Sequence, residues 1–217
     1  YFSLSNHSER QSRFQELIKE NKKIWTTLQV IKDKKFLIYL PITVSLPFIG
    51  TGLIFHQIFI FTQKGWTLEM LGTGFIFFGA FSIIGLLFGG PLIDLLNPKR
   101  AIIYLLFPIF LGINVLLLFE NFYFLIIYMS LFGINLGISA PFVGSLWAEL
   151  FGLESLGTVK ALFHALGVLA SALSPVVFGY IIDWGFGIKV ICIISIIMII
   201  ISSLLPILFY SDEQRNN

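Results

Sequence analysis

The sequence predicts an all-α integral membrane protein with six transmembrane helices, and three observations carry that prediction. Of the 217 residues, 57% are hydrophobic and only 12% are charged, whereas about a quarter of a soluble domain is charged. The apolar residues form six long runs, and the basic residues gather on one side of them. A soluble protein of this size cannot bury so much apolar surface, so its solvent is lipid.

Each predicted span is an apolar run without Asp, Glu, Lys or Arg. A helix needs about 20 such residues to cross the hydrocarbon core. The runs form a bundle over residues 36–210, with spans at 36–61, 71–93, 101–119, 122–147, 161–182 and 190–210. Membrane strands would be about ten residues long with alternating polarity. No such alternation persists here, so the spans are helices.

The basic residues predict the orientation of the bundle. Of the 14 Lys and Arg, eight lie in residues 1–35 and four more lie in the second and fourth connections and the tail, which leaves Lys64 and Lys189 on the other side. The positive-inside rule then places both termini in the cytoplasm, and we expect the plasma (inner) membrane. Residues 1–35 are a cytoplasmic linker that partly forms an amphipathic surface helix, and residues 211–217 are a cytoplasmic tail.

Two similar five-residue segments predict an internal repeat. Gly90-Pro-Leu-Ile-Asp94 closes the second span and Gly179-Tyr-Ile-Ile-Asp183 closes the fifth. Each closes the middle helix of a three-helix unit, and the two units have opposite orientation. We therefore expect a 3+3 inverted repeat. Because the chain begins in polar sequence at Tyr1, without an initiator Met or a signal-peptide pattern, we also expect further chain upstream.

Three segments resemble one family of membrane proteins. They are the basic linker that enters the first span at Asp33-Lys-Lys-Phe36, the loop from Gly90 to Arg100, and the fifth span from Gly157 to Asp183 with its Ser174-Pro175 pair. Together they resemble the C-terminal six-helix half of a major facilitator superfamily transporter. The resemblance covers nearly the whole chain and implies one half of a twelve-helix fold.

The resemblance also implies a function and partners. It implies secondary transport of a small solute by alternating access, and the His and Gln content of the spans permits an organic anion or another metabolite as that solute. The implied partners are that small-molecule substrate, a coupling proton or other ion, the lipid bilayer, and an N-terminal six-helix half of the same protein. It implies no enzyme activity, no cofactor, no metal and no nucleic acid.

The loop after the second span carries the family's signature. Gly90, Asp94, Lys99 and Arg100 match the pattern Gly-x-x-x-Asp followed by a basic pair, which in the family forms a gate on the cytoplasmic side. The loop departs from the pattern at Leu95, Asn97 and Pro98. Asn also tolerates the left-handed backbone that the family's Gly adopts. The alternative reading is a topogenic loop whose basic pair only fixes orientation.

Polar residues inside spans are costly, so they mark candidate sites. We expect the substrate pathway to include His56, Gln57, Asn135, Ser139, His164 and Ser171. In the first span, His56 shares a helical stripe with Ser45 and Gly52. The alternatives are that His56 bonds to a backbone carbonyl, that Asn135 holds helices together, and that the serines pack. By the resemblance, spans one, two, four and five line the cavity.

Two further functional classes remain open. Gly137-Ile-Ser139 lies in the fourth span, where a six-span rhomboid-like serine protease carries its nucleophile, but its His would lie in the sixth span and the chain has His164 in the fifth. A membrane scaffold that transports nothing is the other alternative. Proton coupling within this chain would require His56 or His164, because histidine changes charge nearest neutral pH.

Overall fold

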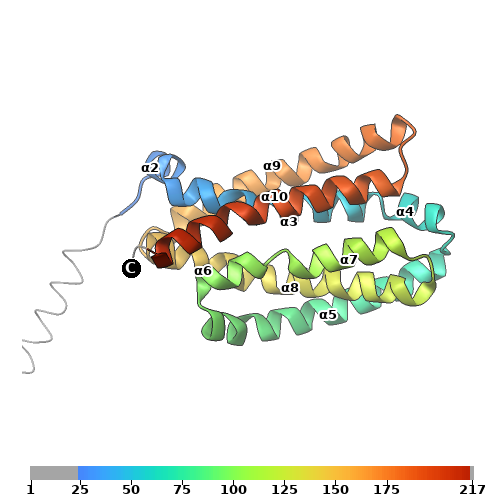
Figure 1. Ribbon diagram of the computed structural model, residues 1–217, viewed down its shortest axis with the longest axis horizontal. Helices are drawn as coiled ribbons and strands as arrows, with labels where there is room; N and C mark the ends of the chain where they lie inside the picture. The colour runs from blue at the N-terminus through green and yellow to red at the C-terminus, as the bar shows by residue number, and fades with distance from the viewer. Residues whose placement is uncertain (1–23, 216–217) are drawn as a thin grey trace, which may run out of the picture.

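The chain folds into a bundle of long helices, and no strand occurs in the part of the chain that the structure describes. The computed structural model describes residues 24–215, with side chains for residues 24–209. Its elements are α2 (Thr27–Lys32), α3 (Lys34–Phe55), α4 (Gln57–Lys64), α5 (Leu68–Leu96), α6 (Pro98–Ala101), η1 (Ile102–Tyr104), α7 (Phe107–Leu118), α8 (Phe122–Phe151), α9 (Leu156–Asp183) and α10 (Ile188–Arg215) (Figure 1).

Six segments among the described residues are long and apolar enough to cross a membrane, which confirms the predicted fold class. They are α3 continued by α4, then α5, then α6 with η1 and α7, and then α8, α9 and α10. Most run several residues past the predicted apolar runs. A helix continues into the interfacial region, where polar residues are tolerated, whereas an apolar run ends at the first charge. Helix α10 continues to Arg215, through most of the predicted tail.

Two spans are broken. The first is interrupted at His56, whose φ of −97° and ψ of 20° separate α3 from α4. The third passes from α6 through the 3₁₀ turn η1 and restarts at α7, with Pro108 in the first turn. The other prolines of the spans lie inside continuous helices, at Pro41, Pro47, Pro91, Pro141, Pro175 and Pro206. Proline therefore marks only one of the two breaks.

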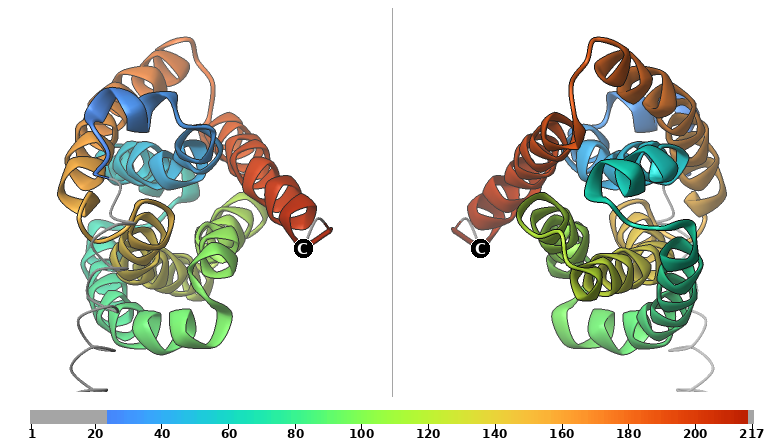
Figure 2. Two further views of the ribbon diagram at one scale, coloured as in Figure 1. Left: turned by 90° about the vertical axis from the view of Figure 1, so that its left-hand side faces the viewer. Right: turned by 90° about the vertical axis from the view of Figure 1, so that its right-hand side faces the viewer.

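The helices pack as two groups. Each group combines the first helix of one triplet with the second and third spans of the other triplet. Helix α3 packs against α9 and α10, and α8 packs against α5 and α7 (Figures 1 and 2). Each contact has a counterpart when the first three spans are exchanged with the last three, because α3 corresponds to α8, α5 to α9 and α7 to α10. The contact between α7 and α10 maps onto itself. This pattern is that of the predicted inverted repeat.

Glycines bring α5 and α8 closer than any other pair. A Cβ at Gly85 would lie 2.5 Å from the Ile134 carbonyl oxygen, and one at Gly133 or Gly137 would overlap the backbone of α5 at Phe78 or Ser82. Small residues at this spacing allow helix backbones to touch in lipid. These contacts give Gly85, Gly89, Gly133 and Gly137 a structural role in holding α5 against α8.

The short helix α2 is fastened to one end of the bundle. The Trp25 backbone N–H donates to Ser155 Oγ at 2.8 Å. The Trp25 ring meets Phe151 edge-on, with centroids 5.1 Å apart, and Val30 is fully buried. We call this end the basic end: it carries α2, the turn at Asn97 and the connection 152–155, and both described termini lie there (Figure 1). Most of the predicted amphipathic segment lies outside the described residues.

Candidate functional site

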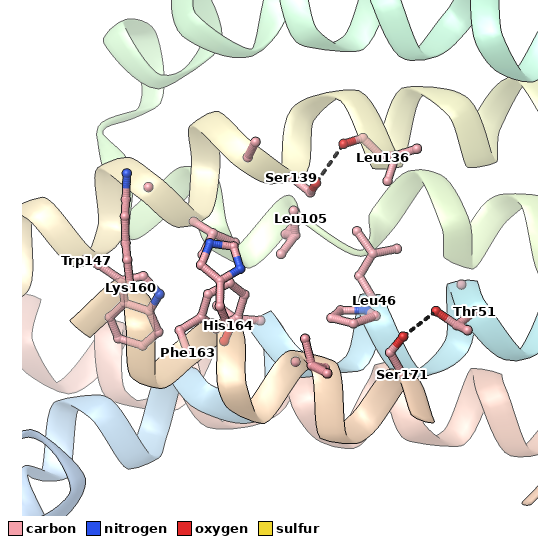
Figure 3. Close-up of a pocket in the computed structure, with 18 of the residues that line it drawn as sticks. Leu46, Thr51, Leu105, Leu136, Ser139, Trp147, Lys160, Phe163, His164 and Ser171 are labelled. Carbon is pink, nitrogen blue, oxygen red and sulfur yellow. Dashed lines mark hydrogen bonds between the residues drawn. The ribbon is translucent and has the colours of Figure 1, made fainter. Parts of the chain in front are cut away.

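A pocket of about 490 Å³ lies between α3, α8 and α9 (Figure 3). Most of its lining is apolar, with Phe132, Leu136, Trp147 and Phe163 among the larger side chains. Its polar lining residues are Thr43, Thr51, Ser139, Lys160, His164 and Ser171. Three of the six predicted pathway residues, Ser139, His164 and Ser171, therefore line one pocket together. Concave, mainly apolar pockets with a few polar groups are typical small-molecule sites.

Helix α9 presents a stripe of pocket residues at helical spacing. Lys160, His164, Gly167 and Ser171 follow each other at i, i+4, i+7 and i+11, so they share one face. The 28 residues of α9 rise about 42 Å, which exceeds a hydrocarbon core of about 30 Å. In an upright, centred helix Lys160 lies at the hydrocarbon boundary, His164 one turn deeper and Ser171 near the midplane.

The hydroxyl groups of the pocket are already hydrogen-bonded. Thr51 Oγ1 and Ser171 Oγ lie 3.0 Å apart and join α3 to α9. The Ser139 hydroxyl donates to the Leu136 carbonyl of its own helix at 2.6 Å. Both bonds are drawn in Figure 3. Because a hydroxyl retains acceptor capacity when it donates, these groups can still receive a hydrogen bond from a solute.

Lys160 is the charged residue of the pocket, and the sequence interpretation placed it only in a connecting loop. Its side chain reaches across to α8, where a Cβ at Gly144 would lie 3.7 Å from its Nζ. The signal that could have found it is its spacing of four residues from His164. Thr43 and Thr51 were also missed, because the stripe chosen on the first span was the wrong one.

The face of the first span that lines the pocket differs from the predicted stripe. The pocket takes Thr43, Pro47, Gly50, Thr51 and Ile54 from α3. In contrast, the Ser45 hydroxyl lies 2.7 Å from that of Ser202 on α10, and Gly52 faces Ser174 and Phe178 of α9. Ser45 and Gly52 of the predicted stripe contact other helices and do not line the pocket. Their position on one helical face therefore did not indicate a cavity.

His56 and Gln57 lie outside the pocket, at the break in the first span. His56 Nδ1 lies 3.0 Å from the Gly52 carbonyl oxygen. This contact is the one expected if His56 bonds to a backbone carbonyl and does not line the substrate pathway. Gln57 is 3% exposed, and its Nε2 contacts Met129 Sδ at 3.7 Å. Their place among packed helices gives them a structural role in this conformation, and the pathway role predicted for them has no support from the pocket.

Asn135 also lies away from the pocket. It is completely buried, and its Oδ1 accepts the Ile109 backbone N–H at 3.0 Å. Ile109 lies in the first turn of α7, which restarts inside the bilayer after the 3₁₀ turn η1, so its N–H lacks the partner that a continuous helix would supply. Asn135 of α8 therefore caps a helix of the broken third span. This contact agrees with the alternative hypothesis that Asn135 holds helices together.

Span two contributes no residue to the pocket lining, contrary to the expectation drawn from the resemblance. Helix α5 packs one face tightly against α8, and its opposite face is exposed at Ile76, Ile83 and Leu87. The glycine contacts that hold α5 against the back of α8 keep it away from the space between α8 and α9. Spans four and five and the first span supply most of the lining, as expected.

The predicted gate loop lies at the basic end. Asp94 is exposed in the last turn of α5, after Gly90. Asn97 has a φ of 60° and ψ of 156°, a backbone conformation that side chains rarely adopt, and its side chain accepts the Arg100 backbone N–H at 3.0 Å. Asn97 thus takes the positive φ expected of the family's Gly, and it starts the short helix that carries Lys99 and Arg100.

Neither a metal centre nor a catalytic pair is assembled in the described part of the chain. No group of three or more His, Cys, Asp or Glu side chains comes together there. Ser139 and His164 line the same pocket, but the Ser139 hydroxyl donates to its own helix, and no hydrogen bond between the two residues occurs among those described. The nucleophile–base contact that a serine protease requires is not formed.

Six helices long and apolar enough to span a membrane, with a pocket between α3, α8 and α9, define a polytopic membrane protein. The Major Facilitator Superfamily matches residues 35–217, and the chain belongs to that family. No curated protein matches the chain significantly. The match supports membrane transport in general, small-molecule substrates and an integral membrane location, and it fits a protein that is not an enzyme.

Proposed function

We propose that the chain is one bundle of a secondary transporter that moves a small solute by alternating access. The observation that carries the proposal is the pocket between α3, α8 and α9, which combines a polar stripe on α9 with apolar walls at membrane depth. The other wall is an N-terminal six-helix half of the same protein. The two bundles rock about the pocket, so that it faces each side of the membrane in turn.

The charged loop and the histidine have roles in this cycle. Asp94, Lys99 and Arg100 lie at the basic end, where a cytoplasmic gate between the two halves closes. His164 lines the pocket and is the residue of this chain placed to carry a coupling proton beside the solute. The basic end faces the cytoplasm of a plasma (inner) membrane, in accord with the distribution of Lys and Arg.

The proposal is tested by the accessibility of the pocket from the two sides of the membrane. In the native protein with Cys192→Ser, the variant Ser139→Cys places one thiol in the pocket. A water-soluble, membrane-impermeant thiol reagent is then applied to right-side-out and to inside-out vesicles. Alternating access predicts that the thiol reacts from both sides, and that a transported solute shifts the ratio of the two rates.

The matched control is Ile200→Cys, on the exposed face of α10 away from the pocket, which lipid should shield from the reagent on both sides. A non-transporting scaffold predicts a Ser139→Cys thiol that reacts from one side only, or from neither. That result, together with no uptake of any solute by proteoliposomes, would exclude the transporter. A protease would instead lose peptide cleavage in the Ser139→Ala variant.

A further inference from the structure

We propose that the solute is a small amphiphilic anion, a monocarboxylate with an apolar body, and that its carboxylate binds Lys160. The inference rests on the proposed function and deepens it by naming the class of solute. Three features of the pocket carry it: the sign of its charge, the space around the Lys160 amine, and the apolar walls beyond that amine.

The charge of the pocket is positive and has no acidic counterpart in its lining. Lys160 lines it together with His164, one turn deeper on the same face of α9, and none of the described lining residues is Asp or Glu. A cation at the hydrocarbon boundary is costly unless it is paired or reaches water. Lys160 is exposed in the structure, so its charge is accessible to a solute in the pocket, and the attraction between opposite charges favours an anion over a neutral solute.

The structure leaves room for a ligand at the Lys160 amine. The end of the side chain lies beside Gly144 of α8, and another pocket residue on that helix is the small Ala140. Figure 3 shows Lys160 and His164 on the same side of the pocket, near Trp147. A larger residue at position 144 would fill the space beside Nζ in which a carboxylate can accept a charge-assisted hydrogen bond.

The walls beyond Lys160 select the rest of the solute. Phe132, Leu136, Trp147 and Phe163 line the pocket, and the deepest hydroxyls, Thr51 and Ser171, already bond to each other. An inorganic oxyanion would leave several of its oxygens against apolar carbon, which is unfavourable. An organic anion can place its one charged end at Lys160 and its apolar body against these side chains.

Thermal-shift titration of the native full-length protein in detergent tests the inference at neutral pH and low salt. The probes are butyrate, hexanoate, benzoate and phenylacetate, each compared with its uncharged primary amide. We expect at least one carboxylate to raise the melting temperature while its amide does not. Lys160→Gln should weaken that binding by about tenfold or more, because a charged hydrogen bond is lost, and Lys160→Arg should retain it. Lys189→Gln, outside the pocket, is the matched control.

Several outcomes would overturn the inference. They are a panel without any carboxylate-specific shift, amides that bind as tightly as their acids, or a Lys160→Gln variant that loses stability without losing carboxylate affinity. The proposed function fails separately. Uptake of a neutral solute by proteoliposomes of a protein that binds no carboxylate would keep transport and reject the anion site. Specific carboxylate binding without uptake would keep the site and reject transport.

Discussion

At Asn135 one side chain completes a helix that begins inside the bilayer. Helix α7 restarts at Phe107 after the break that follows η1, so its first N–H groups do not all find the partners that a continuous helix would supply. Pro108 removes one of these donors because proline has no N–H. Ile109 presents another, which Asn135 Oδ1 accepts from α8 at 3.0 Å. Pro108 and Asn135 therefore account for two positions in the first turn of α7.

Asn135→Ala should lower the stability of the protein without changing which solute it prefers. The Ile109 N–H loses its partner in an apolar environment, at a cost of about 1–3 kcal/mol. The control is Asn114→Ala. Asn114 Nδ2 donates to the Phe110 carbonyl one turn earlier in the same helix, so the loss of this side chain leaves no backbone N–H without a partner. Thermal unfolding in detergent measures both variants. An equal fall in melting temperature for the two would contradict the capping role.

The residue scale also shows what the sequence could and could not predict about the site. The positive φ at Asn97 was predictable, because Asn tolerates a left-handed backbone, but its ψ of 156° lies outside the left-handed helical region. The positions of His56 and Asn135 were not predictable. A polar side chain in a span can face a cavity or satisfy another helix, and both arrangements relieve the same cost of an unpaired polar group. Lys160 was missed because it lies at the boundary, where basic residues also set orientation.

At the scale of elements, α5 and α8 form a closely packed pair. Backbone contact at Gly85, Gly133 and Gly137 replaces the side-chain packing that other pairs use. In the corresponding pair, α3 and α9, Gly52 lies against the side chains of Ser174 and Phe178 and not against backbone. The repeat is thus symmetric in topology and unequal in packing, which leaves the α3–α9 side of the pocket with the looser interface.

Gly133→Ala should separate α5 from α8 and destabilise the protein by about 1–3 kcal/mol, the usual cost of overpacking. Its added methyl group would meet the Phe78 carbonyl oxygen, which is backbone and cannot rotate away. Gly79→Ala on α5 is the matched control. Its methyl group meets nothing within 4 Å, and Ala favours helix by about 1 kcal/mol over Gly. Thermal unfolding should show opposite signs, and similar losses in both variants would refute the close-contact argument.

Element lengths were predictable and element breaks were not. Apolar runs gave the six spans to within a few residues, because the bilayer requires every one of them to be long and free of charge. Prolines were poor guides to breaks, since five of the six spans continue through at least one proline. The break at His56 has no proline beside it, and Asn135 was needed to make the break in span three tolerable.

At the scale of the whole molecule, the distribution of charge predicts the orientation of the bundle in the membrane. Among the described residues, Lys64 and Lys189 lie at the end opposite α2, whereas Lys32, Lys34, Lys99 and Lys160 lie at the basic end. The even number of spans places both described termini together (Figure 1). The excess of basic residues at one end predicts that this end is cytoplasmic.

Two equally exposed loop residues test that orientation. Leu153 in the α8–α9 connection is 76% exposed and Trp184 after α9 is 75% exposed, so their reactivity as cysteines differs only by side of the membrane. In a Cys192→Ser background, an impermeant maleimide should label Trp184→Cys in intact cells, and should label Leu153→Cys only after permeabilisation. The reverse pattern would invert the bundle and place Lys160 at the external mouth of the pocket. In that arrangement an anion would meet Lys160 on entry from outside, and Asp94 and its basic neighbours could not form a cytoplasmic gate.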